Sequence, residues 1–235
     1  MPHPTPRALY ARGFLDGLPF LLVVGPFAML FGVIATEAGL NLAEVMGFSV
    51  LVIAGASQFA ALQMMTDNAP ALLVLSASLI VNLRMAMYSA SLTPHLGAAP
   101  LWQRALIAYF NVDQTYALSV AKYETAPDLP MRQRVAYFFG AATPIGPTWY
   151  MFTLAGALLG TRIPEGYGLD FALPIAFLAM VAPMLRTLAH VAAALTSVLL
   201  ALGLAWMPSG LGLLVAGVVA MVVGAAVEQW REGRA

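Results

Sequence analysis

The chain contains no cysteine, which excludes disulfides, thiolate metal sites and cysteine nucleophiles. Its three histidines are scattered, so we expect no metal and no other cofactor. Only 9% of the residues are charged and the formal net charge is zero, so no basic surface exists to hold nucleic-acid phosphates. The motifs HExxH and GxSxG are absent and the carboxylates are dispersed. The sequence therefore predicts neither a nucleic-acid binder nor an enzyme.

Apolar residues dominate the 235-residue chain: 61% are hydrophobic. A chain this apolar is expected to lie in a lipid bilayer. We expect an all-α polytopic integral membrane protein, a single transporter domain over residues 1–235 with some helices broken by Gly or Pro. Apolar runs between charges and Gly or Pro breaks predict eight transmembrane helices, near 15–35, 44–65, 70–92, 104–122, 135–159, 170–184, 188–206 and 210–228.

The sixth run is short and contains Pro174, so it could instead pair with the seventh as a broken or re-entrant hairpin, which leaves seven spans as the alternative. Eight spans with a cytoplasmic N-terminus leave only Arg104 and Arg162 outside, while most Lys and Arg residues are inside, as the positive-inside rule requires. This count predicts a cytoplasmic C-terminus too. Gly and Pro breaks recur in both halves, which is compatible with inverted repeats but also with their ordinary frequency in membrane helices.

Two charged residues lie deep inside predicted spans, Arg84 in the third and Asp113 in the fourth. A charged group near the bilayer centre costs a few kcal/mol or more, so each needs a partner or a function. Counted along adjacent helices at about 1.5 Å per residue, both lie at nearly equal depth. The sequence therefore predicts an Arg84–Asp113 ion pair.

The pair has two interpretations: it locks two helices together, or Arg84 receives a substrate carboxylate while Asp113 is its resting counter-ion or a proton site. Other polar groups favour the second interpretation. Asn82 shares the third span with Arg84, and Tyr88 lies on the same face one turn later. Asn111 and Gln114 flank Asp113 on the fourth span.

The second predicted span carries the run GASQF halfway along its length. Gly55 and Ser57 permit close helix packing, which is the simpler interpretation. Gln58 brings an amide to mid-depth, and a helix broken at Gly55 would free backbone groups that can bind an ammonium or a carboxylate. We therefore include Gly55, Ser57 and Gln58 among the candidate substrate-binding residues.

Five segments closely resemble the AzlC family, the large subunit of branched-chain amino acid exporters. They are PFAMLFG (26–32), AGL (38–40), AGASQF (54–59), NLRMAMYSASL (82–92) and LPIAFLAM (173–180). The resemblance covers almost the whole chain. It implies an inner-membrane permease that exports leucine, isoleucine, valine and often methionine together with a small AzlD-type membrane subunit of about four spans.

Two positions depart from the family pattern. The family commonly reads NLRH where this chain has Met85, and TDE where it has Gln114 after Asp113. Neither replacement can carry a proton at physiological pH, which leaves Asp113 as the candidate coupling residue.

These observations predict a secondary exporter of hydrophobic amino acids with Gly55, Ser57, Gln58, Asn82, Arg84, Tyr88, Asp113 and Gln114 at its site. Its expected partners are the amino acid, an AzlD-like subunit and the lipid bilayer. The alternatives are a passive channel for small solutes and a membrane scaffold that transports nothing.

Overall fold

The computed structural model describes residues 4–160, 185, 187–207 and 211–232, and every element in these ranges is helical. Contacts divide the chain into two compact units, Met1–Ala172 and Leu173–Ala235. An all-helical fold is thus confirmed, while the single transporter domain stays a prediction. The predicted span at 170–184, on which the choice between seven and eight spans depended, lies outside the described residues.

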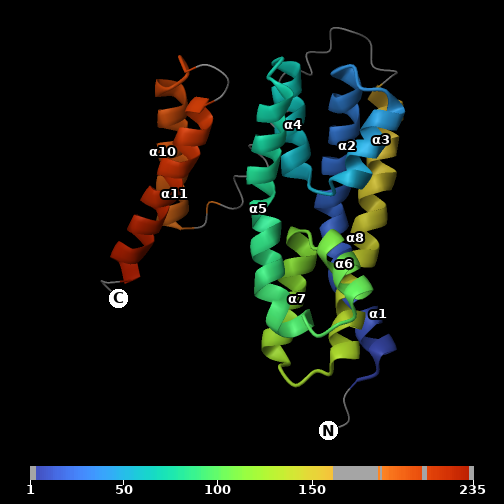
Figure 1. Ribbon diagram of the computed structural model, residues 1–235. Coiled ribbons are helices and arrows are strands. Elements are labelled where there is room, and N and C mark those ends of the chain that lie inside the picture. The colour runs from blue at the N-terminus through green and yellow to red at the C-terminus, as the bar shows by residue number, and fades with distance from the viewer. Residues whose placement is uncertain (1–3, 161–184, 186, 208–210, 233–235) are drawn as a thin grey trace. The chain divides into compact units, whose positions relative to one another are not determined.

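Three long helical segments form the frame of unit 1 (Figure 1). The first is α1 (Pro6–Gly17), the short 3-10 helix η1 (Leu18–Phe20) and α2 (Leu21–Glu37); the others are α5 (Ala71–Leu96) and α8 (Met131–Gly160). We call the end where α1 begins and α5 ends the base, and the end where α2 ends and α5 begins the top. Two of the described helices, Pro6–Glu37 and Ala71–Leu96, are long and apolar enough to cross a membrane.

Glycines bring the first segment against α8 at backbone distance. A Cβ on Gly13 or Gly32 would collide with the backbone of α8, and a Cβ on Gly140 or Gly156 would collide with the backbone of α1 or α2. The contacts are therefore reciprocal, because both the first segment and α8 contribute glycines to them. Small residues that permit such close approach are the usual basis of helix packing in membranes, where apolar burial drives little association.

The predicted spans at 44–65 and 104–122 are not single helices, and this corrects the sequence analysis. The first consists of α3 (Leu42–Leu51, 10 residues) and α4 (Gly55–Thr66, 12 residues). The second consists of α6 (Leu101–Tyr109, 9 residues) and α7 (Asp113–Thr125, 13 residues). Each half is roughly 14–20 Å long at 1.5 Å per residue, too short for a hydrocarbon core of about 30 Å.

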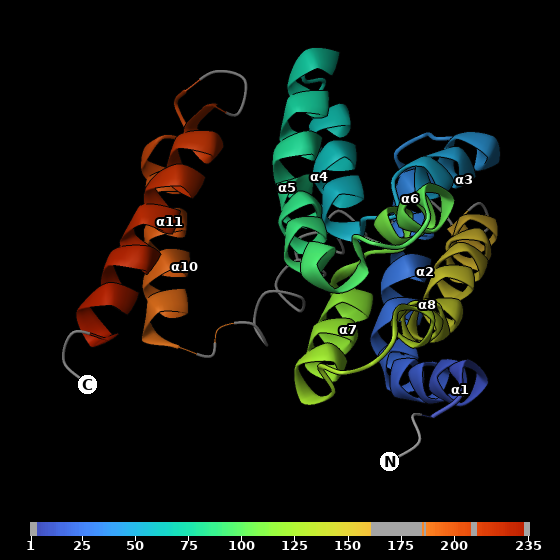
Figure 2. The same ribbon diagram turned by 60° about the horizontal axis from the view of Figure 1, so that its bottom comes forward.

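Each pair of short helices folds back on itself as a hairpin. Hairpin 1 (residues 42–66) begins and ends at the top of unit 1, and hairpin 2 (residues 101–125) begins and ends at the base (Figures 1 and 2). An apolar run of about 20 residues fits either one complete span or two half-spans, which is why composition alone predicted helices that cross. Backbone at membrane depth without helical bonds is tolerated where protein covers it or a cavity lies beside it.

The two hairpins are related by an internal repeat in the backbone. Helix α7 begins at Asp113, 58 residues after α4 begins at Gly55. At the breaks, Ala54 N–H donates to the Val52 carbonyl at 2.8 Å, and 58 residues later Val112 N–H donates to the Phe110 carbonyl at 2.9 Å. The hairpins enter from opposite ends, so the similar breaks have opposite orientations in the described part of unit 1; inverted repeats of the two halves of the chain stay a prediction.

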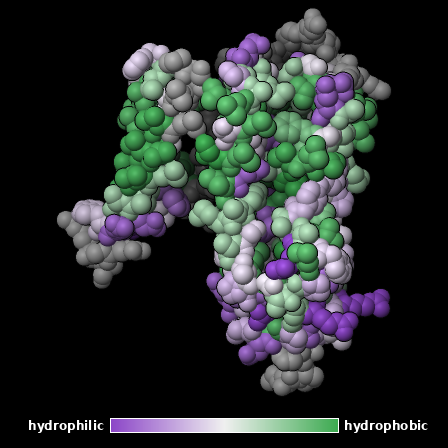
Figure 3. All heavy atoms as spheres, in the orientation of Figure 1, coloured by the Kyte–Doolittle hydropathy of each residue, from purple (hydrophilic) through white to green (hydrophobic). Residues whose placement is uncertain are grey.

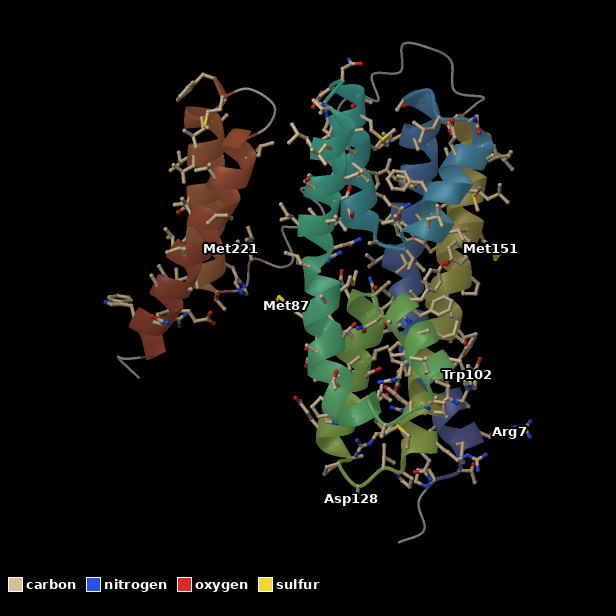
Figure 4. All side chains as sticks on the ribbon, in the orientation of Figure 1. Arg7, Met87, Trp102, Asp128, Met151 and Met221 are labelled. Carbon is tan, nitrogen blue, oxygen red and sulfur yellow. The ribbon has the colours of Figure 1, made fainter. Side chains whose placement is uncertain are left out.

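Charged residues follow this arrangement. Apart from Arg84, the described Lys and Arg residues of unit 1 lie in segments at the base: Arg7, Arg12, Arg104, Lys122, Arg132 and Arg134. Figure 3 shows hydrophilic residues gathered there, and Figure 4 places Trp102 at the base with Arg7 and Asp128. Arg104 was expected on the opposite side from Arg7. It lies at the same end because its segment is a hairpin and does not cross.

Unit 2 contains α10 (Leu188–Gly203) and α11 (Leu211–Glu232). They correspond to the predicted spans at 188–206 and 210–228. The helices pack on each other through small residues, with Gly224 of α11 against Ala193 and Ala189 of α10. Thr187 caps the start of α10 by accepting a hydrogen bond from the backbone N–H of His190 at 3.2 Å.

Candidate functional site

The predicted ion pair is present at the break of hairpin 2. Arg84 lies near the middle of α5, and its Nη1 is 3.0 Å from Oδ2 of Asp113, the first residue of α7. Their side chains are 28% and 42% exposed, so further groups can approach the pair. The carboxylate lies in the first turn of α7, at the positive end of the helix dipole, where a negative charge interacts favourably with the free N–H groups.

Aromatic and amide groups surround the pair. The ring of Tyr88 stacks on that of Tyr116 with centroids 4.1 Å apart, and its hydroxyl lies close to the Asp113 carboxylate. The buried amide of Asn111 donates to the hydroxyl of Ser89 at 3.3 Å. These contacts tie the break of hairpin 2 to α5, with a charged pair on one side and a buried amide on the other.

Several buried polar atoms near the pair have no hydrogen-bond partner among the described residues. They are Asn82 Oδ1, Arg84 Nε, Asn111 Oδ1 and Asp113 Oδ1. Most buried polar groups in folded proteins are paired, so these atoms are available to hydrogen-bond a polar ligand. The set offers one donor, on the arginine, and three acceptors. That combination suits a small molecule with both an anionic and a cationic group.

Hairpin 1 has a different polar network. Gln58 is fully buried and its Nε2 donates to the Ser49 hydroxyl of α3 at 3.0 Å, and Ser49 in turn donates to Thr153 of α8 at 3.4 Å. Ser57 donates to the Ser78 carbonyl of α5 at 3.0 Å. The chain Gln58–Ser49–Thr153 fixes the amide, and its Oε1 has no partner among the described residues.

Gly55 is required by its surroundings. A Cβ at this position would lie 2.5 Å from the Phe27 ring and 2.7 Å from the Trp149 ring. The two rings cover the start of α4, and the neighbouring Ile53 packs on the same apolar cluster as Val112 of hairpin 2. The breaks of both hairpins therefore contact one cluster, although they enter unit 1 from opposite ends.

The helix ends at the two breaks carry opposite partial charges. Helices α4 and α7 present their N-termini, with free N–H groups, and α3 and α6 present their C-termini, with free carbonyls. Thr115 partly satisfies hairpin 2, since its hydroxyl lies 2.6 Å from the Phe110 carbonyl and 2.9 Å from the Val112 carbonyl. The first turn of α7 contains Asp113, whereas that of α4 contains no acidic residue.

The eight predicted site residues thus fall into two groups. Arg84, Tyr88 and Asp113 come together, with Asn82 on the same helix and Gln114 beside Asp113 at the start of α7. Gly55, Ser57 and Gln58 belong to the break of hairpin 1. The two groups are linked through α5, which bonds Ser57 and carries Arg84. Their role in binding substrate stays a prediction.

The sequence analysis missed Ser49, Thr153 and Tyr109. The hydroxyl of Tyr109, at the end of α6, donates to the Val50 carbonyl of α3 at 2.6 Å. Nothing in the local sequence marks these residues, because their partners lie on distant segments. The polar residues that interrupt the two apolar runs were the available sequence signal for the breaks. Among the described residues, no group of three or more His, Asp or Glu could hold a metal ion.

Comparison with known proteins places this arrangement in context. Residues 19–163 match the AzlC protein family. The inner membrane protein YgaZ of Escherichia coli is 28% identical over 184 residues, which cover 75% of this chain and 74% of the relative. An uncharacterized membrane protein of Archaeoglobus fulgidus is 28% identical over 196 residues, covering 80% and 81%. One from Helicobacter pylori is 26% identical over 176 residues, covering 73% and 75%. No solved structure matches the chain significantly.

Proposed function

Because the chain belongs to the AzlC family of membrane proteins, we propose that it is a secondary transporter, not an enzyme, that exports branched-chain or other hydrophobic amino acids. The observation that carries this proposal is the pair of opposed broken hairpins with the Arg84–Asp113 pair at one break. Broken helices at the bilayer midplane are a common way for transporters to bind small charged substrates.

An amino acid presents a carboxylate, an ammonium and an apolar side chain. Arg84 and the free N–H groups at the start of α4 suit the carboxylate, because a guanidinium binds it in a fork and helix N-termini favour anions. Asp113, Gln58 Oε1 and the free carbonyls at the breaks suit the ammonium. The apolar side chain fits against the Phe27 and Trp149 rings, which lie 5.9 Å apart between centroids.

The distribution of charge supports an orientation in the membrane. Apart from Arg84, the described Lys and Arg residues of unit 1 lie in segments at the base, whereas the top carries Glu37, Glu44 and Asp67. Cytoplasmic loops are enriched in Lys and Arg, so the base and the N-terminus face the cytoplasm of the inner membrane. Export then runs from base to top. We propose a multi-pass chain with an even number of crossings, which places the C-terminus on the same cytoplasmic side as the N-terminus.

Asp113 is the proposed coupling residue, and a small AzlD-like membrane subunit is the proposed partner. Asp113 has a carboxylate, which is able to accept a proton, whereas the side chains of Met85 and Gln114 are not. Protonation would release Arg84 from its partner and free it for the substrate carboxylate. The partner is proposed because the sequence resembles the large subunit of branched-chain amino acid exporters, a resemblance that implies a small AzlD-type subunit.

The first experiment tests export in cells. Cells that lack the protein and are fed dipeptides of valine, leucine, isoleucine or methionine should accumulate the free amino acid, and the gene should restore export. Arg84→Ala should not restore it, whereas Arg104→Ala, which removes an exposed arginine at the base, should. Unchanged intracellular levels of all four amino acids would reject the substrate class.

The second experiment uses purified protein in sealed vesicles. Preloaded substrate should drive uphill counterflow of labelled substrate, which a passive channel cannot do. The transported amino acid should also stabilise the protein against heat, because a ligand that binds only the folded state stabilises it. A scaffold would show neither effect.

A further inference from the structure

The two hairpins are joined by a hydrogen bond between a side chain and a freed carbonyl. The Tyr109 hydroxyl, on the last residue of α6 in hairpin 2, donates to the Val50 carbonyl of α3 in hairpin 1 at 2.6 Å. The same oxygen lies 2.5 Å from the hydroxyl of Tyr150 on α8. Since Tyr109 uses its only hydrogen on Val50, Tyr150 is the donor of this second bond.

The carbonyl of Val50 is available only because hairpin 1 breaks here. In a continuous helix it would accept from the N–H of Ala54, four residues on. That N–H bonds to the Val52 carbonyl instead, at 2.8 Å. The bond from Tyr109 thus depends on the broken conformation, and any change of the break that moves Val50 removes it.

The position of this contact gives it a consequence for transport. Hairpin 1 enters unit 1 from the top and hairpin 2 from the base, so a bond between them joins elements anchored at opposite ends (Figure 1). A solute that passes between top and base by way of the breaks, as the proposed function has it, would require the hairpin tips to separate, so a bond between them opposes that passage.

We propose that the Tyr109 hydroxyl is a latch that holds the tips of the two hairpins together, and that its release from Val50 opens the route between base and top. Tyr109 is therefore a positioning residue and does not need to touch the substrate. Tyr150 orients the latch, since its hydrogen bond leaves the Tyr109 hydrogen directed at Val50. This inference rests on the proposed transport function.

The absence of native cysteines makes the test direct, because a single introduced thiol is the only reactive one. Ala54→Cys places a thiol at the break of hairpin 1, where Ala54 is buried in the closed arrangement. Its rate of modification by a membrane-impermeant thiol reagent, measured from each face of sealed vesicles, reports opening of the tips.

Tyr109→Phe should raise the modification rate about 2- to 10-fold, the change that loss of one hydrogen bond produces. Tyr150→Phe is the matched control: it removes one hydroxyl nearby but leaves the bond between the hairpins. It should change the rate less than Tyr109→Phe does. An unchanged rate in Tyr109→Phe, or an equal rise in both variants, would overturn the proposal.

A crosslink provides a second measurement should Tyr109→Phe fold poorly. In the double variant Val50→Cys with Tyr109→Cys, a short bifunctional thiol reagent joins the hairpins covalently. Amino-acid counterflow should be lost on crosslinking and present before it; full counterflow by the crosslinked protein would overturn the latch. Failure of the transport proposal would give a different result. The Ala54→Cys protein would then show no counterflow of any amino acid, while its rate of thiol modification would still depend on Tyr109.

Discussion

Variants of the Arg84–Asp113 pair distinguish a substrate-binding role from a purely structural one. Exposed ion pairs are worth about 0–1 kcal/mol, whereas loss of one partner from a buried pair costs about 3–5 kcal/mol. With side chains 28% and 42% exposed, this pair lies between the two cases. We therefore expect Arg84→Ala to lower the free energy of unfolding by about 1–3 kcal/mol and to abolish transport.

Two further variants distinguish charge from shape. Arg84→Lys keeps the positive charge but loses the planar fork that binds a carboxylate through two hydrogen bonds. If Arg84 receives the substrate carboxylate, this variant should fold normally and transport poorly. Arg84 Nε has no partner among the described residues, so part of the fork is unoccupied in the resting pair.

The double variant Arg84→Met with Asp113→Leu removes both charges and with them the burial penalty. Thermal unfolding in detergent should show it at least as stable as Arg84→Ala, and counterflow in vesicles should be absent. Wild-type export by this variant would refute the reasoning, because the pair would then only lock α5 to hairpin 2. Normal folding without transport would support a role in binding.

Three other changes test separate parts of unit 1. Gly156→Leu should lower thermal stability by about 1–3 kcal/mol or more, since any side chain there meets the backbone of α2, whereas Gly47→Ala, in open space, should change it little. Ser49→Ala leaves the buried Gln58 amide without an acceptor, so it should lower the free energy of unfolding by about 1–3 kcal/mol more than Gln58→Met, which removes the amide. Equal melting temperatures of the two variants would contradict this. Asp113→Asn should retain counterflow but lose accumulation driven by a pH gradient; full accumulation would exclude Asp113 as the coupling residue.

The ion pair could be predicted from the sequence because few charges occur in apolar runs. Arg84 and Asp113 each require a partner at mid-depth, and short loops restrict the choice of neighbours. The prediction that Arg84 and Asp113 lie at similar depth is consistent with their ion pair, but the reason given for it was wrong. Asp113 lies near the middle of the unit because α7 begins there, at the tip of a hairpin, and not because a crossing helix passes that depth.

The hairpins could not be predicted from hydropathy, because the length of an apolar run does not show whether the chain crosses the membrane or turns back halfway. Ten residues that enter and twelve that return have the same composition as one span of that length. The polar residues at the tips carried the only signal. Asn111 and Asp113 interrupt one run and Ser57 and Gln58 the other, and such interruptions often mark broken helices.

The two hairpins share a backbone but differ in side chains, and the proposed substrate explains the difference. Asp113 of hairpin 2 corresponds to Gly55 of hairpin 1 in the 58-residue repeat. Equal hairpins would present two equivalent helix N-termini, which suit two anions. An amino acid carries opposite charges, so a site built from two such ends must be made unequal. Asp113 and its partner Arg84 place charged side chains at the start of α7, whereas the first turn of α4 has no acidic residue, so the two ends offer different groups to a zwitterion.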